Sequence, residues 1–185
     1  MASGPFADLP VRPLRGMRGG RFELLVQREE HAGEMFGLLA DPALYTFEGS
    51  PPESLEWLRE RFARLESTYS PDRRERWLNW VVQLPAPGRL AGFVQATVGE
   101  DASAAIAYVM GSAYWGRGLA REAVATVLAE LANYYGVTLF TAIVKRDNVR
   151  SRHLLERLSF AASESGLRVH SAVAEDEILL TRGAA

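Results

Sequence analysis

The chain has 185 residues, of which 48% are hydrophobic and 24% are charged, and it contains no cysteine. A chain of this length suits one domain with its own core. The lack of cysteine excludes disulfides, thiolate nucleophiles and cysteine-based zinc sites. The 21 basic and 23 acidic residues give a net charge of −2, which argues against a dedicated nucleic-acid-binding protein.

The first 20 residues are rich in glycine, proline and arginine, and they lack the apolar run of a signal peptide. We expect residues 1–20 to be poorly ordered. No apolar run in the chain approaches the roughly 18 residues that cross a bilayer. The sequence therefore predicts one domain over residues 21–185, in a cytoplasmic protein without a membrane partner.

The first expected elements are a strand over residues 21–27 and a helix over residues 29–39, whose apolar residues repeat at helical spacing. Ser50 and Glu53 have the spacing of a capping box, and the two prolines between them suit a first helical turn. A stripe of apolar residues follows at intervals of three and four. This pattern predicts an amphipathic helix over residues 53–69.

The middle of the chain changes to an alternating pattern, which predicts an antiparallel meander of three strands. They cover residues 77–84, 90–98 and 104–110. A glycine-rich junction leads into a helix over residues 119–135, which Gly136 is expected to cap. The remaining expected elements are a strand over residues 138–144, a helix over 149–158, and strands over 163–170 and 174–181. This order predicts an α/β or mixed α+β fold, with helices on both faces of a mixed sheet.

The glycine-rich junction reads Tyr-Trp-Gly-Arg-Gly-Leu-Ala over residues 114–120. Free N–H groups and the positive end of the dipole at a helix N-terminus attract phosphates, and glycines allow a close approach. Arg117 and Arg121 could add charge-assisted hydrogen bonds. The alternative is a turn that serves folding alone. The P-loop and dinucleotide patterns both fail, because the first needs Gly-Lys-Ser/Thr and the second needs a glycine at Arg121.

The junction resembles the pyrophosphate-binding loop of the GNAT superfamily, the acyl-CoA-dependent N-acyltransferases, although Trp115 stands where that pattern has glutamine or arginine. It is most similar to the branch of ribosomal-protein serine and alanine N-acetyltransferases. Two downstream segments, Asn-Val-Arg-Ser at 148–151 and Leu-Glu-Arg-Leu-Ser-Phe at 155–160, resemble that branch's Asn-x-x-Ser and Glu-Lys-x-Gly-Phe. The resemblance extends from residue 21 to residue 181. It implies a GNAT-like, mostly antiparallel, splayed sheet of about seven strands.

The resemblance also implies a site for acetyl-CoA. The splayed strand before the loop would offer main-chain groups of Val109 and Met110 to the pantetheine arm, with Tyr108 beside them. Asn148 would hold the pantetheine side, and Ser151 would lie near the thioester sulfur. The residues implied at the pyrophosphate are Trp115, Gly116, Arg117, Gly118, Leu119, Ala120 and Arg121.

The chain departs from the family pattern at the positions that carry acid and base chemistry. Many members have a tyrosine general acid where this chain has Leu155, so Ser151 or a water is the candidate acid. Ser151 has an alternative role, because a serine hydroxyl in a first helical turn can satisfy a backbone group. The branch often has a glutamate where this chain has Ala105, so the general base is not identified. The terminal Gly-Phe is replaced by Ser159 and Phe160.

The resemblance implies an enzyme that moves an acetyl group from acetyl-CoA to a primary amine by direct transfer in a ternary complex, without a metal. The absence of cysteine excludes a covalent thiol intermediate. A protein N-terminus, a small amine and an antibiotic all stay open as acceptors, and a homodimer stays open as the oligomeric state. The alternative is a non-catalytic acyl-CoA-binding protein of the same fold, which the missing glutamate at Ala105 motivates.

Overall fold

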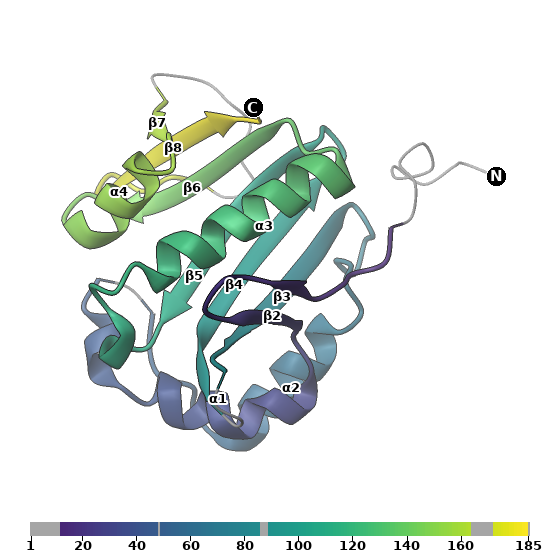
Figure 1. The fold of residues 1–185 in the computed structure, drawn as a ribbon, viewed down its shortest axis with the longest axis vertical. Coiled ribbons are helices and arrows are strands. Elements are labelled where there is room, and N and C mark those ends of the chain that lie inside the picture. Colours follow the sequence, from purple (N-terminus) through teal and green to yellow (C-terminus); the bar gives the residue numbers. More distant parts are fainter. Residues whose placement is uncertain (1–11, 48, 86–88, 164–171, 185) are drawn as a thin grey trace.

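A computed structural model describes residues 12–47, 49–85, 89–163 and 172–184. Within these residues, eight strands form one sheet in the order β1-β2-β3-β4-β5-β6-β8-β7. All neighbouring strands are antiparallel except β5 and β6, which are parallel. The mixed, mostly antiparallel sheet with helices on both faces that the sequence predicted is therefore confirmed (Figure 1).

The strands follow the expected order, with one unexpected short strand at the start. They are β1 Met17–Arg18, β2 Glu23–Val26, β3 Glu75–Gln83, β4 Leu90–Gly99, β5 Ser103–Met110, β6 Leu139–Lys145, β7 Ala161–Ala162 and β8 Glu177–Gly183. Of the strand expected at 163–170, only Ser163 lies within the described residues, and β7 ends just before it.

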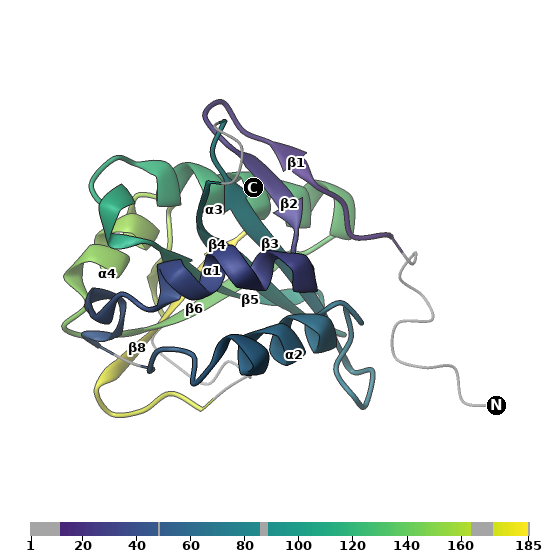
Figure 2. The same ribbon diagram turned by 90° about the horizontal axis from the view of Figure 1, so that it is seen from below.

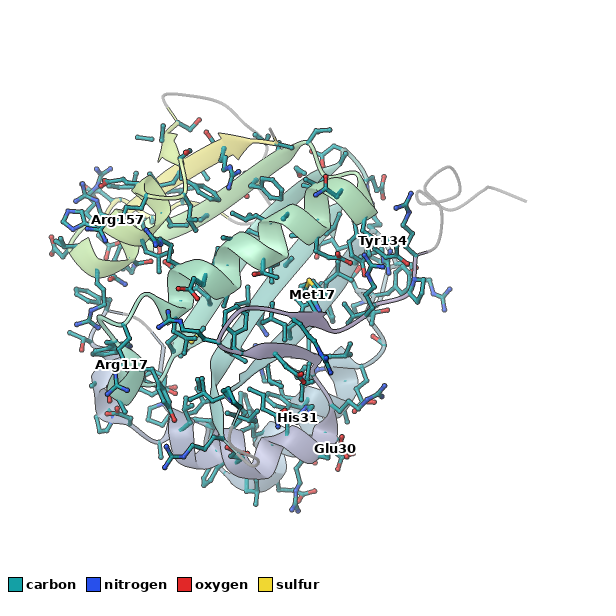
Figure 3. The ribbon with its side chains drawn as sticks, in the orientation of Figure 1. Met17, Glu30, His31, Arg117, Tyr134 and Arg157 are labelled. Atoms are coloured by element: carbon teal, nitrogen blue, oxygen red, sulfur yellow. The ribbon has the colours of Figure 1, made fainter. Side chains whose placement is uncertain are left out.

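Residues 1–20 were expected to be poorly ordered, but residues 12–20, the part that the structure describes, are held by contacts to α3 and the sheet. Arg15 pairs with Glu130 at 2.6 Å, and its guanidinium stacks 3.8 Å from the ring centroid of Tyr134, at the end of α3 (Figure 3). The indole N–H of Trp80 donates to the Arg15 carbonyl at 2.9 Å. These contacts hold the chain against the sheet ahead of β1, whereas residues 1–11 lie outside the described residues.

Four α-helices and three short 3₁₀ turns complete the described structure. The helices are α1 Ala32–Leu39, α2 Leu55–Leu65, α3 Leu119–Tyr135 and α4 Val149–Glu156, and the turns are η1 Glu29–His31, η2 Pro42–Tyr45 and η3 Ser112–Tyr114. None of these helices is long and apolar enough to span a membrane.

The start of α2 differs from the expected capping box at Ser50. Ser54 has extended backbone angles, and its hydroxyl accepts the N–H of Trp57 at 3.0 Å, so Ser54 is the N-cap. A residue that precedes proline avoids helical backbone angles, which keeps Pro51 out of the helix. The predicted box between Ser50 and Glu53 is therefore wrong, although the amphipathic helix itself is present.

The helices form two layers around the sheet. Helix α3 lies along one face, while α1 and α2 lie on the other (Figures 1 and 2). The larger core lies beneath α3, where Val124 and Val127 pack with Trp80. The smaller core lies beneath α1 and α2, around Met35 and Phe62.

The sheet opens between β5 and β6. Strand β5 pairs with β4 along nearly all its length, up to Met110 opposite Gly92. Its parallel pairing with β6 covers only three positions and ends at Ala105 opposite Thr141. The splay that the family resemblance implied is therefore present, and it exposes one edge of β5 beyond Ala105.

Candidate functional site

The exposed edge of β5 carries main-chain groups that point away from β4. Gly111 donates its N–H toward β4, whereas the Ala104 carbonyl faces Thr141 on the side of β6. Main-chain groups alternate in direction along an antiparallel strand. The N–H and C=O of Tyr108 and the N–H of Met110 therefore face the open side, and those of Val109 face β4.

A cavity of about 300 Å³ adjoins this open edge, between η2, β5 and the N-terminal turns of α3 and α4. Seven of the residues that the sequence singled out line it together. Its wall consists of Ala43, Leu44, Thr46, Phe47, Tyr108, Val109, Met110, Trp115, Ala120, Asn148, Arg150, Ser151 and Leu154. The other loop residues expected at the site, 116–119 and 121, form the turn and first residues of α3 beside it.

The turn before α3 requires its two glycines. Gly116 and Gly118 have φ values of +73° and +74°, which L side chains rarely adopt. Gly118 is the N-cap of α3 and supplies no side-chain cap. The first N–H groups of this 17-residue helix are consequently left for a ligand or water, which is the geometry that binds anions.

Arg21 fixes this turn from a distant part of the chain. Its guanidinium donates to the Arg117 carbonyl at 3.0 Å and to both carboxylate oxygens of Glu122, at 2.7 and 3.1 Å. Arg117 itself lies on the turn ahead of α3 (Figure 3). Sequence reasoning missed Arg21, because nothing local to it signals a partner about 100 residues away.

Trp115 connects the end of β5 to α4. Its indole N–H donates to the Met110 carbonyl at 2.7 Å. The guanidinium of Arg150 stacks on the same ring, 3.6 Å from its centroid, a close cation–π contact. Trp115 stands where the family pattern has glutamine or arginine, and here Arg150 from α4 brings a positive charge to the same place. Sequence reasoning did not single out Arg150.

Ser151 is hydrogen bonded through its hydroxyl to Tyr108, with 2.8 Å between the two oxygens. The side chain of Asn148 accepts the N–H of Ser151 at 3.1 Å and caps α4. The capping role therefore belongs to Asn148, and the Ser151 hydroxyl is left to the cavity. The position of the usual tyrosine acid, Leu155, is fully buried in the core.

Tyr108 stays protonated at neutral pH. Burial raises the pKa of its phenol to about 12, against a smaller lowering by the bond to Ser151. A protonated phenol can donate to the Ser151 oxygen, and the serine proton then points elsewhere. With Tyr108 as the donor, the Ser151 hydroxyl can donate into the cavity.

The described part of the cavity wall carries no carboxylate. Asp41 lies nearby, but it accepts the N–H of Ala43 and the hydroxyl of Ser112, contacts that hold η2 against η3. These hydrogen bonds lower the pKa of Asp41 below its usual value. Among the described residues, no three histidine, aspartate or glutamate side chains are grouped to hold a metal ion.

Residues 21–161 match the family described as the acetyltransferase (GNAT) domain. The chain belongs to the GNAT acetyltransferase family. The matched residues include the turn before α3, the open edge of β5 and both ends of α4, so the GNAT assignment covers the whole cavity described above.

Solved GNAT structures share the fold at low sequence identity. The ribosomal-protein-S5-alanine acetyltransferase from Vibrio fischeri superposes with a TM-score of 0.75 at 17% identity, over 91% of this chain and 96% of that chain. RimL, a ribosomal L7/L12 α-N-protein acetyltransferase in complex with coenzyme A, gives 0.72 at 15%, over 92% and 96%. The microcin C7 self-immunity acetyltransferase MccE, in complex with acetyl-CoA and AMP, gives 0.72 at 18%, over 89% and 93%.

Proposed function

We propose that this GNAT protein transfers the acetyl group of acetyl-CoA to a primary amine by direct attack within a ternary complex. The observation that carries the proposal is the cavity where the open edge of β5 meets the Tyr108–Ser151 hydroxyl pair and the N-terminus of α3. The structures of RimL with coenzyme A and of MccE with acetyl-CoA support this choice of co-substrate. The acyltransferase domain in this proposal covers residues 21–185.

The cavity residues fit a CoA thioester in three places. The outward Tyr108 carbonyl and the Met110 N–H can pair with the amides of the pantetheine arm, beside Asn148, which leaves the Tyr108 N–H for the thioester. The turn over residues 115–121 leaves the first N–H groups of α3 open to the pyrophosphate, and a Cβ built on Gly116 would meet nothing within 4 Å. Arg150 adds a positive charge at the cavity wall.

In the proposed reaction, the amine nitrogen bonds to the thioester carbonyl carbon and the carbon–sulfur bond breaks. The main-chain N–H of Tyr108 stabilises the negative charge that develops on the carbonyl oxygen. The Ser151 hydroxyl, oriented by Tyr108, donates to the departing thiolate, which takes its proton through Ser151 or from water. Water removes the proton that the amine loses, because the described wall offers no carboxylate.

The alternative is a non-catalytic acyl-CoA-binding protein of the same fold. Ala105 favours it, because the glutamate that the related branch often has is absent there. Both proposals require that CoA stabilises the folded protein, by about 2.7 kcal/mol at a hundredfold excess over Kd. Only the enzyme releases free thiol from acetyl-CoA when an amine is added.

The test combines thermal unfolding with thiol release over peptides, polyamines and aminoglycosides. We expect CoA to raise the Tm and at least one amine class to support turnover. A raised Tm without turnover on any amine would favour the non-catalytic protein. An unchanged Tm at millimolar CoA would refute both functions.

A further inference from the structure

A second cavity, of about 320 Å³, lies between α2 and the sheet, on the face opposite α3. We call it the α2 groove; Figure 2 shows the face of the sheet on which α2 lies. Apart from Ala96, which belongs to the larger core, the strand residues in its wall alternate with residues of that core, so they belong to the face that α1 and α2 cover. The wall consists of Arg61, Arg64, Leu65, Trp77, Asn79, Gln95, Ala96 and Thr97.

The α2 groove lies two strands away from the open edge of β5. Asn79 on β3 pairs with Gln95 on β4, which in turn pairs with Ala107 on β5. Neighbouring strands are about 4.8 Å apart, so Asn79 lies roughly 10 Å from Ala107. Ala107 is exposed and adjoins Tyr108 in the chain. The small side chains of Ala105 and Ala107 leave this stretch of sheet surface accessible to an extended molecule.

Asn79 presents a donor that needs an oxygen acceptor. Its side chain is only 4% exposed, and its Nδ2 atom has no hydrogen-bond partner among the described residues. A buried donor without a partner costs about 1–3 kcal/mol, so such atoms are normally satisfied by a ligand or water. The adjacent Gln27 has no partner among the described residues for its side-chain donor Nε2 or its acceptor Oε1, and its main-chain N–H donates to the Asn79 carbonyl at 3.0 Å.

The groove wall carries two positive side chains, and the carboxylate of Glu75 lies beside it, where it accepts the indole N–H of Trp77 at 3.2 Å. Arg61 and Arg64 line it from α2, and no acidic residue belongs to its described wall. In the described ranges neither guanidinium has a carboxylate within ion-pair distance, whereas Arg59 on the same helix pairs with Glu56. One amide and two guanidinium groups form a donor set that suits a planar carboxylate.

We propose that the α2 groove binds a carboxylate of the amine acceptor, roughly 10–15 Å from the nitrogen that is acetylated. This inference rests on the proposed function, because it places that nitrogen at the open edge of β5. An extended peptide covers about 3.3–3.6 Å per residue, so the backbone of three residues together with the glutamate side chain at the third position would reach the groove from a reacting N-terminus. The substrate class is therefore an amine that carries a distant carboxylate, such as an acidic N-terminal peptide.

The test compares three tripeptide amides, Ala-Ala-Glu, Ala-Ala-Gln and Ala-Ala-Lys. Binding to the CoA-saturated protein is followed by the NMR signal of the Asn79 side-chain amide, and acetylation by kcat/KM with acetyl-CoA. We expect the glutamate peptide to exceed the glutamine peptide by about tenfold in both measurements, and the lysine peptide to be weakest. Arg61→Gln and Arg64→Gln should each reduce this preference, while the matched control Arg59→Gln should preserve it.

Each outcome separates the inference from the proposed function. Acetylation of all three peptides at equal kcat/KM would overturn the carboxylate site and leave the acetyltransferase intact. Binding of the glutamate peptide at Asn79, with no acetylation of any amine, would support the groove and overturn the enzymatic function. An Asn79 signal that no peptide moves would assign Gln27 as its partner and overturn the inference.

Discussion

Removing the Ser151 hydroxyl is the sharpest test of the proposed chemistry. Ser151→Ala deletes the oxygen that lies 2.8 Å from the Tyr108 phenol, and the α4 cap is kept because Asn148 accepts the main-chain N–H of residue 151. If the hydroxyl donates to the leaving thiolate, turnover should fall by about 10²–10⁴. CoA affinity should hardly change, which is the signature of an interaction made mainly in the transition state.

The structure also sets the expected cost in stability. After Ser151→Ala, the Tyr108 hydroxyl retains only the carbonyl of residue 151, at 3.4 Å. A buried hydroxyl left without a good partner costs about 1–3 kcal/mol. In a chain of this size, each 1 kcal/mol lowers the Tm by about 2–4 °C. Adding Tyr108→Phe removes the stranded hydroxyl, so the double variant should regain stability without a further loss of turnover.

The assay is thiol release from acetyl-CoA, together with calorimetry of CoA binding and thermal unfolding. Thr46→Ala is the matched control, because it removes another hydroxyl from the same cavity wall. Wild-type turnover in Ser151→Ala would assign the acid role to water. Losses in turnover that add in the Ser151→Ala, Tyr108→Phe double variant would refute the orienting role of the phenol.

Three further variants test the binding part of the site. Gly118→Val should weaken CoA binding severely, because Gly118 has a φ of +74° and a branched side chain there both strains the turn and covers its N–H groups; unchanged affinity in a folded protein, measured by calorimetry, would rule out the turn as the pyrophosphate site. Arg150→Gln should lower CoA affinity about tenfold and make that affinity less sensitive to salt. If calorimetry gives the variant and the unsubstituted protein the same CoA affinity at low and at high salt, Arg150 only packs on Trp115. Asn148→Ala should destabilise the protein by about 1 kcal/mol while Asn148→Asp keeps the cap, and identical melting curves for both would contradict the capping role.

The clearest successes of sequence reasoning were elements whose ends have a local signal. Helix α3 was predicted residue for residue, since Gly118 and Gly136 bound it in left-handed conformations that favour glycine. The start of α2 was misplaced because two serines precede it. Backbone geometry beside consecutive prolines, rather than residue type, decides in favour of Ser54.

The decisive contacts of the site depend on the tertiary structure. Tyr108 and Ser151 are 43 residues apart, and they meet only because β5 separates from β6 next to the start of α4. Whether Tyr108 or Val109 turns its main-chain groups to the open side depends on the register of the pairing between β4 and β5. No sequence motif shows that register. Strand β1 has two residues and pairs only with β2, so no periodicity could reveal it.

The short ladder between β5 and β6 divides the sheet into two units, which we expect to exchange amide hydrogens at different rates. Strand β6 pairs with β8 at seven positions but with β5 at only three. The unit of β6, β7, β8 and α4 can thus open from the rest by breaking few hydrogen bonds, an opening cheaper than global unfolding. A thioester bound along the open edge of β5 and against α4 would contact both units and disfavour the opening. Its binding should therefore slow amide hydrogen exchange in β8 as well as in the strands that it contacts.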